Sequence, residues 1–239
     1  MEVIRNKMHI LLTRQLEDCS DLIVRFKELG HIVSHLPLLN IEKVKYNQKS
    51  FEDCKCIIFT SANAIKFLDT KEINKNIKCF CVGLSTEKKA KSVGFQNIIS
   101  AEGNVRNLKE LILQNFKPTD GNIVYVSGEV ISTDLDHQLI NEGYSVKRII
   151  SYKTHPNQNY NNKFVESLKM NIPQIVYIYS YNSALSFLNF IKNERVESLW
   201  MDTNLMCMSE KTSSILNEIK WKKIFLFNPG EEEFLLYKI

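Results

Sequence analysis

Short apolar runs alternate with amphipathic segments along most of this chain, from the run HILLT at 9–13 to the segment EEEFLLYKI at 231–239. The runs are short, which suits strands better than buried helices. The segments between them carry apolar residues three and four positions apart, the spacing of a helix with one face on a core. Strands alternating with helices predict an α/β fold built on parallel sheets.

The individual elements follow from these patterns. Predicted strands lie at 9–13, 31–39, 56–60, 78–83, 95–100, 122–128, 144–152, 175–180, 205–209 and 223–227. Predicted helices lie at 16–29, 62–68, 85–93, 105–116, 133–143, 182–191, 210–219 and 231–239. Pro37 lies near the end of the second strand, and the polar stretch NQNYNN at 157–162 opens the last block of elements.

Part of the chain is duplicated. The segment at 81–99 aligns with the one at 207–225 at a constant offset, so that Cys81 matches Cys207, Thr86 matches Thr212 and Phe95 matches Trp221. Upstream of these segments, 57–67 resembles 177–187, and downstream both copies close as a loop and a helix. Matching units in the same order predict two similar α/β halves.

The two halves are not consecutive in the chain. The first strands and helix, 1–36, precede a complete middle block, 40–150, and the remaining elements come after Pro156. We therefore predict one discontinuous domain, 1–36 plus 154–239, and one inserted domain, 40–150. The linkers 37–45 and 151–156 would then cross between the domains as a pair and form a hinge.

Composition and charge exclude several classes of protein. The chain has 239 residues and a net charge of +4, a basic excess too small and too scattered to favour nucleic-acid binding. No apolar run approaches the ~20 residues of a membrane span. The start does not read as a secretory signal, so we expect a cytoplasmic protein with six reduced cysteines.

The cysteines have two interpretations, metal ligands or buried small hydrophobes. Cys54/Cys56 and Cys79/Cys81 are each two residues apart in or beside predicted strands, so we expect each pair to share one strand face. The chain has no C-x2-C motif and no histidine near the pairs. We therefore expect buried thiols and no metal.

Familiar catalytic motifs are missing: there is no P-loop, G-x-S-x-G, H-E-x-x-H or GxGxxG sequence. What recurs is hydroxyl and small residues where a strand ends and a helix begins: Thr13-Arg14, Thr60-Ser61, Gly83 with Ser85 and Thr86, Ser127-Gly128, Ser180, and Ser209 with Thr212. In α/β folds ligands bind at these strand ends, where free N–H groups suit carboxylates or phosphates. Serine and threonine there also serve as ordinary helix caps.

The order of these segments resembles the uroporphyrinogen-III synthase family. The likeness rests on ILLTR at 10–14, FTSANAIKF at 59–67, VGLSTEKKAKSVGF at 82–95, VSGEV at 126–130 and LINEGYSVKRIISYKT at 139–154. It implies two α/β domains joined by a two-stranded β-ladder, and a monomer. The sequence departs from the family at Ser209, where glycine is common, and an arginine often found after the VSGEV turn is missing.

The resemblance also implies a reaction. Hydroxymethylbilane, a linear tetrapyrrole polycarboxylate, would be cyclised with loss of water and inversion of its last ring, ring D, without cofactor or metal. Tyr152 matches a family tyrosine that would assist the departing hydroxyl, although it would also suit a structural tyrosine packed at the hinge. The expected substrate-binding residues are Thr13, Arg14, Thr60, Ser61, Gly83, Ser85, Thr86, Ser127, Gly128, Ser180 and Thr212.

Two alternatives to an active synthase remain open from the residues. Paired α/β domains with a double crossover also suit a small-anion binding module resembling a periplasmic binding protein, although the missing signal peptide counts against it. A catalytically degenerate synthase-like domain would keep the same fold and serve as a binding partner.

Overall fold

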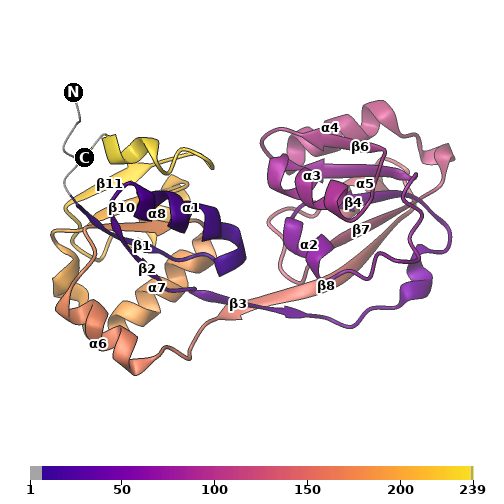
Figure 1. Cartoon of the computed structure of the whole chain (residues 1–239). Coiled ribbons are helices and arrows are strands. Elements are labelled where there is room, and N and C mark those ends of the chain that lie inside the picture. The colour runs from indigo at the N-terminus through magenta and orange to yellow at the C-terminus, as the bar shows by residue number, and fades with distance from the viewer. Residues whose placement is uncertain (1–6, 238) are drawn as a thin grey trace. The chain divides into compact units, whose positions relative to one another are not determined.

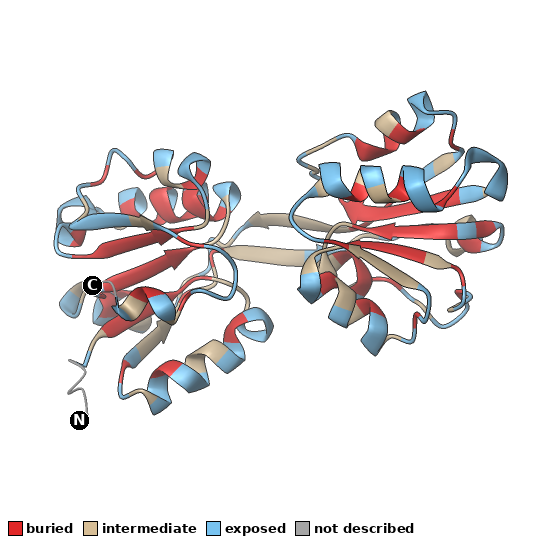
Figure 2. Ribbon diagram, turned by 90° about the horizontal axis from the view of Figure 1, so that it is seen from above, coloured by how far each residue is buried: buried red, intermediate tan, exposed pale blue. Residues whose placement is uncertain are grey.

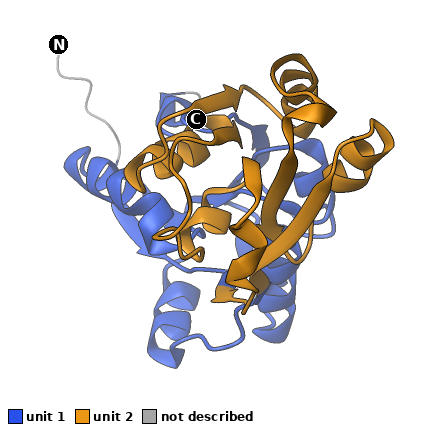
Figure 3. Ribbon diagram, turned by 90° about the vertical axis from the view of Figure 1, so that its right-hand side faces the viewer, with its two compact units in different colours: residues 1–40, 155–239 blue, residues 41–154 orange. Residues whose placement is uncertain are grey.

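The chain forms two compact units in the computed structural model, which describes residues 7–237 and 239. The first unit combines residues 1–40 with 155–239, and the second consists of residues 41–154 (Figure 3). The limits expected from the sequence were 1–36 with 154–239 for one domain and 40–150 for the other. Each unit is an α/β layer structure with its own sheet.

The first unit is built on a five-stranded parallel sheet in the order β11-β10-β9-β1-β2 (Figure 1). Its strands are β1 (His9–Leu12), β2 (Ile32–His35), β9 (Ile175–Ile178), β10 (Asn204–Cys207) and β11 (Lys223–Leu226). Its helices are α1 (Leu16–Glu28), α6 (Asn162–Met170), α7 (Tyr181–Asn193) and α8 (Glu210–Ser214), with short 3-10 turns at Glu197–Trp200 and Phe234–Tyr237.

The sheet of the first unit has a core on each face. Leu11, Val176 and Leu205 pack against α6 and α7, whereas the alternate residues Ile10 and Tyr177 pack against α1 and the C-terminal turn. Parallel strands covered on both faces are apolar at nearly every position, which explains the continuous apolar runs in the sequence.

The second unit has a six-stranded sheet in the order β3-β8-β7-β4-β5-β6. Its strands are β3 (Leu39–Lys43), β4 (Cys54–Phe59), β5 (Lys78–Val82), β6 (Ile98–Ala101), β7 (Asn122–Gly128) and β8 (Val146–Pro156). Its helices are α2 (Ala62–Lys66), α3 (Gly83–Ser92), α4 (Val105–Asn115) and α5 (Leu135–Asn141), with 3-10 turns at Gln48–Phe51 and Pro118–Asp120.

Helices α2 and α3 cover one face of this sheet, and α4 and α5 cover the other. The central strands β4, β5 and β7 are mostly buried and the outer helix surfaces are exposed, as Figure 2 shows by colour. The two strands β3 and β8 carry the two chain crossings between the units, at 40–41 and 154–155. They lie next to each other in the sheet order and form the predicted two-stranded ladder.

The duplication seen in the sequence is a duplication of sheets. Read across the sheet, β11-β10-β9-β1-β2 of the first unit corresponds to β6-β5-β4-β7-β8 of the second. The matched residues Cys81 and Cys207 lie in the corresponding strands β5 and β10, and both are buried. The predicted fold, two similar parallel α/β domains with the first discontinuous, is thus confirmed.

Three predicted elements differ most from the structure. The strand predicted at 31–39 is two strands, β2 and β3, because Pro37 between them has no N–H for a ladder hydrogen bond. The helix predicted at 210–219 ends at Ser214, where the hydroxyls of Ser213 and Ser214 donate to the carbonyls of Glu210 and Lys211. The helix predicted at 231–239 is one 3-10 turn over Phe234–Tyr237, and residue 238 lies outside the described residues.

Helix α6 was missed by the sequence analysis. Its start is hidden in the polar stretch before it, where the Asn161 side chain accepts hydrogen bonds from the N–H groups of Lys163 and Phe164. Its buried residues Val165 and Leu168 are three apart, the spacing of one helix face.

The expected common face of Cys54 and Cys56 was wrong. The pairing of β4 with β7 shifts register between these two residues, and Cys54 joins the core under α2 and α3 whereas Cys56 joins the core under α4 and α5. A bulge interrupts the two-residue alternation of a strand, so residues two apart need not share a face.

Candidate active site

The carboxyl ends of three adjacent strands in the second unit, together with the part of β8 beside them, bring together most of the predicted residues of that half. The ends of β7, β4 and β5 carry Ser127 with Gly128, Thr60 with Ser61, and Gly83, whereas Tyr152 lies within the longer strand β8, opposite Gly128. All four strands run parallel, so their carboxyl ends lie on one edge of the sheet. This edge is where α/β folds bind ligands.

Tyr152 occupies a defined position at this edge. Its ring stacks on Phe67, the residue that ends α2, with ring centroids 6.3 Å apart and an angle of 28° between the planes. It is half-buried and packs on the core under α2 and α3. Among the residues that the structure describes, none accepts a hydrogen bond from its hydroxyl, so the phenol is available to a ligand.

Two other hydroxyls at this edge, those of Thr60 and Ser61, have partners within the protein. Thr60 Oγ1 lies 3.1 Å from Tyr125 Oη, and burial raises the pKa of Tyr125. The Ser61 side chain accepts from the N–H of Asn63 and so caps α2. Thr86 is buried in the first turns of α3, whereas Ser85 is exposed. Gly83 begins α3 with a φ of 76°, a left-handed conformation that favours glycine.

The first unit has a corresponding edge, formed by the carboxyl ends of β1, β9 and β10. Thr13 follows β1, but its Oγ1 donates to the carbonyl of Tyr177 at 2.5 Å in a buried position. The next residue, Arg14, places its guanidinium 4.8 Å from the centre of the Tyr179 ring. No carboxylate of the described residues forms an ion pair with Arg14, so its charge remains available to an anion.

Ser180 and Thr212 lie at the starts of two helices on this edge. Ser180 caps α7, with its Oγ accepting from Ser183 N–H and lying 2.8 Å from Ser183 Oγ. Ser209 caps α8, and its Oγ lies 2.9 Å from Oγ1 of the buried Thr212. The capping interpretation of these serines is therefore correct, and it leaves backbone N–H groups at the helix starts as further donors.

Nucleophilic cysteine chemistry has no support in the structure. All six cysteines are free and buried. Burial raises the pKa of the Cys19 and Cys54 thiols to about 11 and that of Cys207 to about 12, so these thiols stay protonated near neutral pH.

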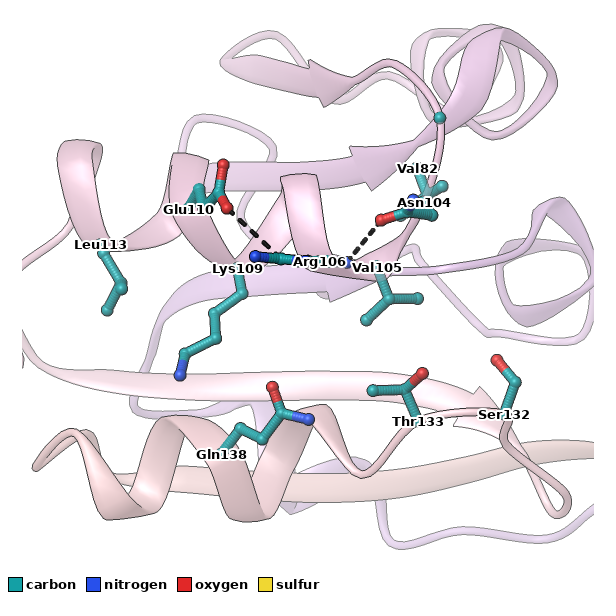
Figure 4. Close-up of a pocket in the computed structure, with 11 residues that line it drawn as sticks. Val82, Asn104, Val105, Arg106, Lys109, Glu110, Leu113, Ser132, Thr133 and Gln138 are labelled. Carbon is teal, nitrogen blue, oxygen red and sulfur yellow. Dashed lines mark hydrogen bonds and ion pairs between the residues drawn. The ribbon is translucent and has the colours of Figure 1, made fainter.

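A groove of about 810 Å³ lies between α4 and α5 of the second unit, and the sequence analysis did not identify it (Figure 4). Arg106 and Lys109 on α4 give it positive charge, and Gln138 lines the opposite side from α5. Arg106 pairs with Glu110 at 3.8 Å and Lys109 with Glu142 at 2.8 Å. An anion bound in this groove would have to compete with these carboxylates for Arg106 and Lys109.

Residues 7–237 and 239 contain no group of three His, Cys, Asp or Glu side chains placed to hold a metal ion. Their helices include none with the length and apolar character that a bilayer crossing needs.

Comparison with known proteins places the chain in a family. Uroporphyrinogen-III synthetase from Helicobacter pylori is 16% identical and aligns with a TM-score of 0.64 over 97% of this chain and 100% of that chain. A mutant uroporphyrinogen III synthase from Thermus thermophilus is 13% identical, with a TM-score of 0.56 over 97% of each chain. At these identities the likeness concerns the fold, and no curated protein sequence matches significantly.

The sequence itself matches the family model described as Uroporphyrinogen-III synthase HemD over residues 20–226. This match covers well over half of the chain and spans both units, including the strand ends that carry Tyr152, Thr60, Gly83, Ser180 and Thr212. The protein therefore belongs to the uroporphyrinogen-III synthase family, whose members are enzymes of tetrapyrrole synthesis.

Proposed function

We propose that this protein is a lyase that cyclises hydroxymethylbilane to uroporphyrinogen III, with loss of water and inversion of ring D. The observation that carries the proposal beyond family membership is the Tyr152 hydroxyl, which lies at the ligand-binding edge of a parallel sheet without a hydrogen-bond partner among the described residues.

The reaction requires control of conformation more than reactive groups. Departure of the hydroxyl from the hydroxymethyl group on ring A, together with a proton, releases water and leaves an electrophilic azafulvene. The substituted α-carbon of ring D attacks this carbon and forms a spiro-pyrrolenine. Fragmentation frees ring D from its neighbour, and re-closure through its other α-carbon, with loss of a proton, gives the inverted ring.

Tyr152 would assist the first step. Its Oη donates a hydrogen bond to the departing hydroxyl and so stabilises the charge that develops on that oxygen, a form of general-acid help typically worth ~10²–10⁴-fold. Stacking on Phe67 holds the ring in place, so little side-chain freedom remains to be lost when the bilane binds.

The polycarboxylate substrate would be held by many donors. Arg14 offers a guanidinium that pairs with no carboxylate among the described residues, and Arg–carboxylate pairs are among the stronger charge-assisted hydrogen bonds. The backbone N–H groups near Ser61, Ser180 and Gly83 add donors at helix starts, where the helix dipole favours negative charge. We propose that Thr60, Ser85, Thr86 and Ser127 shape the strand ends of the second unit, and that Thr13 and Thr212 shape those of the first.

The remaining expectations accompany this proposal. The reaction needs no cofactor, and we propose that the protein acts as a monomer. Six free cysteines suit a reducing compartment such as the cytoplasm.

The decisive experiment is turnover of freshly prepared hydroxymethylbilane by the purified protein, with the two product isomers separated. Formation of uroporphyrinogen III supports the proposal, whereas only the non-inverted isomer, which forms without a catalyst, would overturn it. Tyr152→Phe removes the phenol and should lower kcat at least severalfold.

The control for Tyr152→Phe is Tyr160→Phe in the first unit. The Tyr160 hydroxyl is buried and has no hydrogen-bond partner among the described residues, so its removal should leave kcat unchanged. A normal kcat in Tyr152→Phe would take Tyr152 out of the mechanism while leaving the synthase activity itself untouched.

A further inference from the structure

Strand β8 contains a bulge at the residue before Tyr152. Ser127 of β7 pairs with Ile150, but the next residue, Gly128, pairs with Tyr152, so Ser151 is an extra residue in β8. Two consecutive residues of such a bulge can point to the same side of the sheet. That is the case here: Ser151 Oγ donates to the carbonyl of Ala64 in α2 at 3.0 Å, and the Tyr152 ring stacks on Phe67 at the end of α2.

The bulge therefore decides which side of the sheet Tyr152 lies on. In a regular strand Tyr152 would alternate with Ser151 and lie on the opposite face, under α4 and α5. The register shift instead puts the phenol beside α2, at the strand ends described above.

Gly128 provides the space that this position needs. A Cβ at residue 128 would lie 2.7 Å from Cζ and 3.0 Å from Oη of Tyr152. The distance to Cζ is shorter than real Cβ atoms essentially ever show. Unlike the other glycines of the chain, Gly128 has no left-handed φ that would itself demand glycine. The requirement at this position is the room taken by the phenol.

Arg148 holds the β7 side of the same contact. Its Nε donates to Ser127 Oγ, and its Nη2 donates to the carbonyls of Gly128 and Glu129, each at 2.8 Å. The N–H of Glu129 in turn donates to the carbonyl of Tyr152 at 2.9 Å. One planar guanidinium thus fixes three consecutive residues opposite the bulge, a geometry that a lysine ammonium cannot reproduce.

We propose that Gly128 and Arg148 are positioning residues that set where the Tyr152 hydroxyl lies, and that they act on the reaction only through Tyr152. The proposal rests on the role proposed above for Tyr152. Displacement of a reacting group by about 1 Å can cost ~10²-fold in rate, so small shifts of this phenol should reduce turnover rather than substrate affinity.

The test compares Gly128→Ala and Arg148→Lys with the wild-type protein in kcat, KM and the fraction of the inverted isomer. Both variants should lower kcat by about 10- to 100-fold and keep KM within about threefold, because the carboxylate donors are unchanged. The isomer ratio should shift toward the non-inverted product as enzymatic turnover slows. Lys147→Met, which changes the exposed neighbour of Arg148, should behave as wild type.

A second background separates positioning from general damage to the fold. In Tyr152→Ala the ring is gone, so Gly128→Ala should change the remaining kcat by less than about twofold. The proposal would be overturned if Gly128→Ala lowered kcat by the same factor in the wild-type and the Tyr152→Ala backgrounds. It would also be overturned if Gly128→Ala and Arg148→Lys both kept wild-type kcat while Tyr152→Phe lowered it. Wild-type kcat in Tyr152→Phe would instead refute the role of Tyr152. Urea unfolding of each variant checks that the variant is folded. If Gly128→Ala does not fold, Arg148→Lys alone tests the positioning role.

Discussion

A substitution at Thr13 tests whether a hydroxyl at the strand ends of the first unit binds substrate or stabilises the fold. The sequence places it at a strand end where it suits an anion, yet its Oγ1 donates to the buried carbonyl of Tyr177 at 2.5 Å. Thr13→Val keeps the shape of the side chain and replaces the hydroxyl with a methyl group, which cannot donate a hydrogen bond. We expect this substitution to lower the stability of the protein and to leave substrate binding nearly unchanged.

The magnitude follows from the partner that is lost. A neutral hydrogen bond contributes about 0.5–1.5 kcal/mol, and leaving a buried carbonyl short of a partner costs about 1–3 kcal/mol. Thr13→Val should therefore reduce the free energy of unfolding by about 1–3 kcal/mol, measured by urea denaturation. Had the hydroxyl instead donated to a substrate carboxylate, its loss would cost about 1.5–3 kcal/mol of binding, a roughly 10- to 100-fold rise in KM.

Thr203 is a matched control in the same unit. Its Oγ1 donates to the buried carbonyl of Pro173 at 2.6 Å, but it precedes β10 and so lies at the opposite edge of the sheet from Thr13. Thr203→Val should cost a similar free energy of unfolding and leave KM unchanged. A tenfold rise in KM for Thr13→Val alone, with wild-type stability, would refute the structural assignment.

Three other changes test the fold, one at the candidate site and two at the opposite edge of the first unit's sheet. Ser61→Ala removes the cap of α2 and should lower the free energy of unfolding by about 0.5–2 kcal/mol in urea denaturation; no change would mean that the cap is dispensable. Trp200→Ala empties the core beside Phe187, whose ring centroid is 5.1 Å away, and should cost about 3–5 kcal/mol in the same assay; a loss below about 1 kcal/mol would contradict this packing. Burial lowers the pKa of His9 below its usual 6.5, so the unfolded chain binds a proton more readily and stability should fall as pH drops below that value. Urea denaturation at about pH 7.5 and 5.5 should show that the free energy of unfolding falls less between these pH values in His9→Gln than in wild type. An equal fall in both proteins would count against a lowered pKa of His9.

Much of the architecture could be read from the amino-acid sequence because it depends on local periodicity. Fully apolar runs such as Ile175–Ile178 predict parallel strands covered on both faces, and the match of Thr86 with Thr212 predicts the two similar sheets. The strand ends that carry the candidate site follow from the same pattern. Elements whose signals lie in polar residues were harder to predict: α6 begins at a side-chain cap, and α8 is cut short by serine hydroxyls.

Only the tertiary structure decided what each polar group at the strand ends can do. The sequence placed Thr13, Ser61 and Ser180 alike, but the fold commits their side chains to protein partners and leaves the Tyr152 hydroxyl and the Arg14 charge without one among the described residues. The bulge that turns Tyr152 toward α2 also has no local signature. Cross-strand register and the use of each hydrogen-bonding group depend on residues far apart in the chain, and these meet only when the sheet forms.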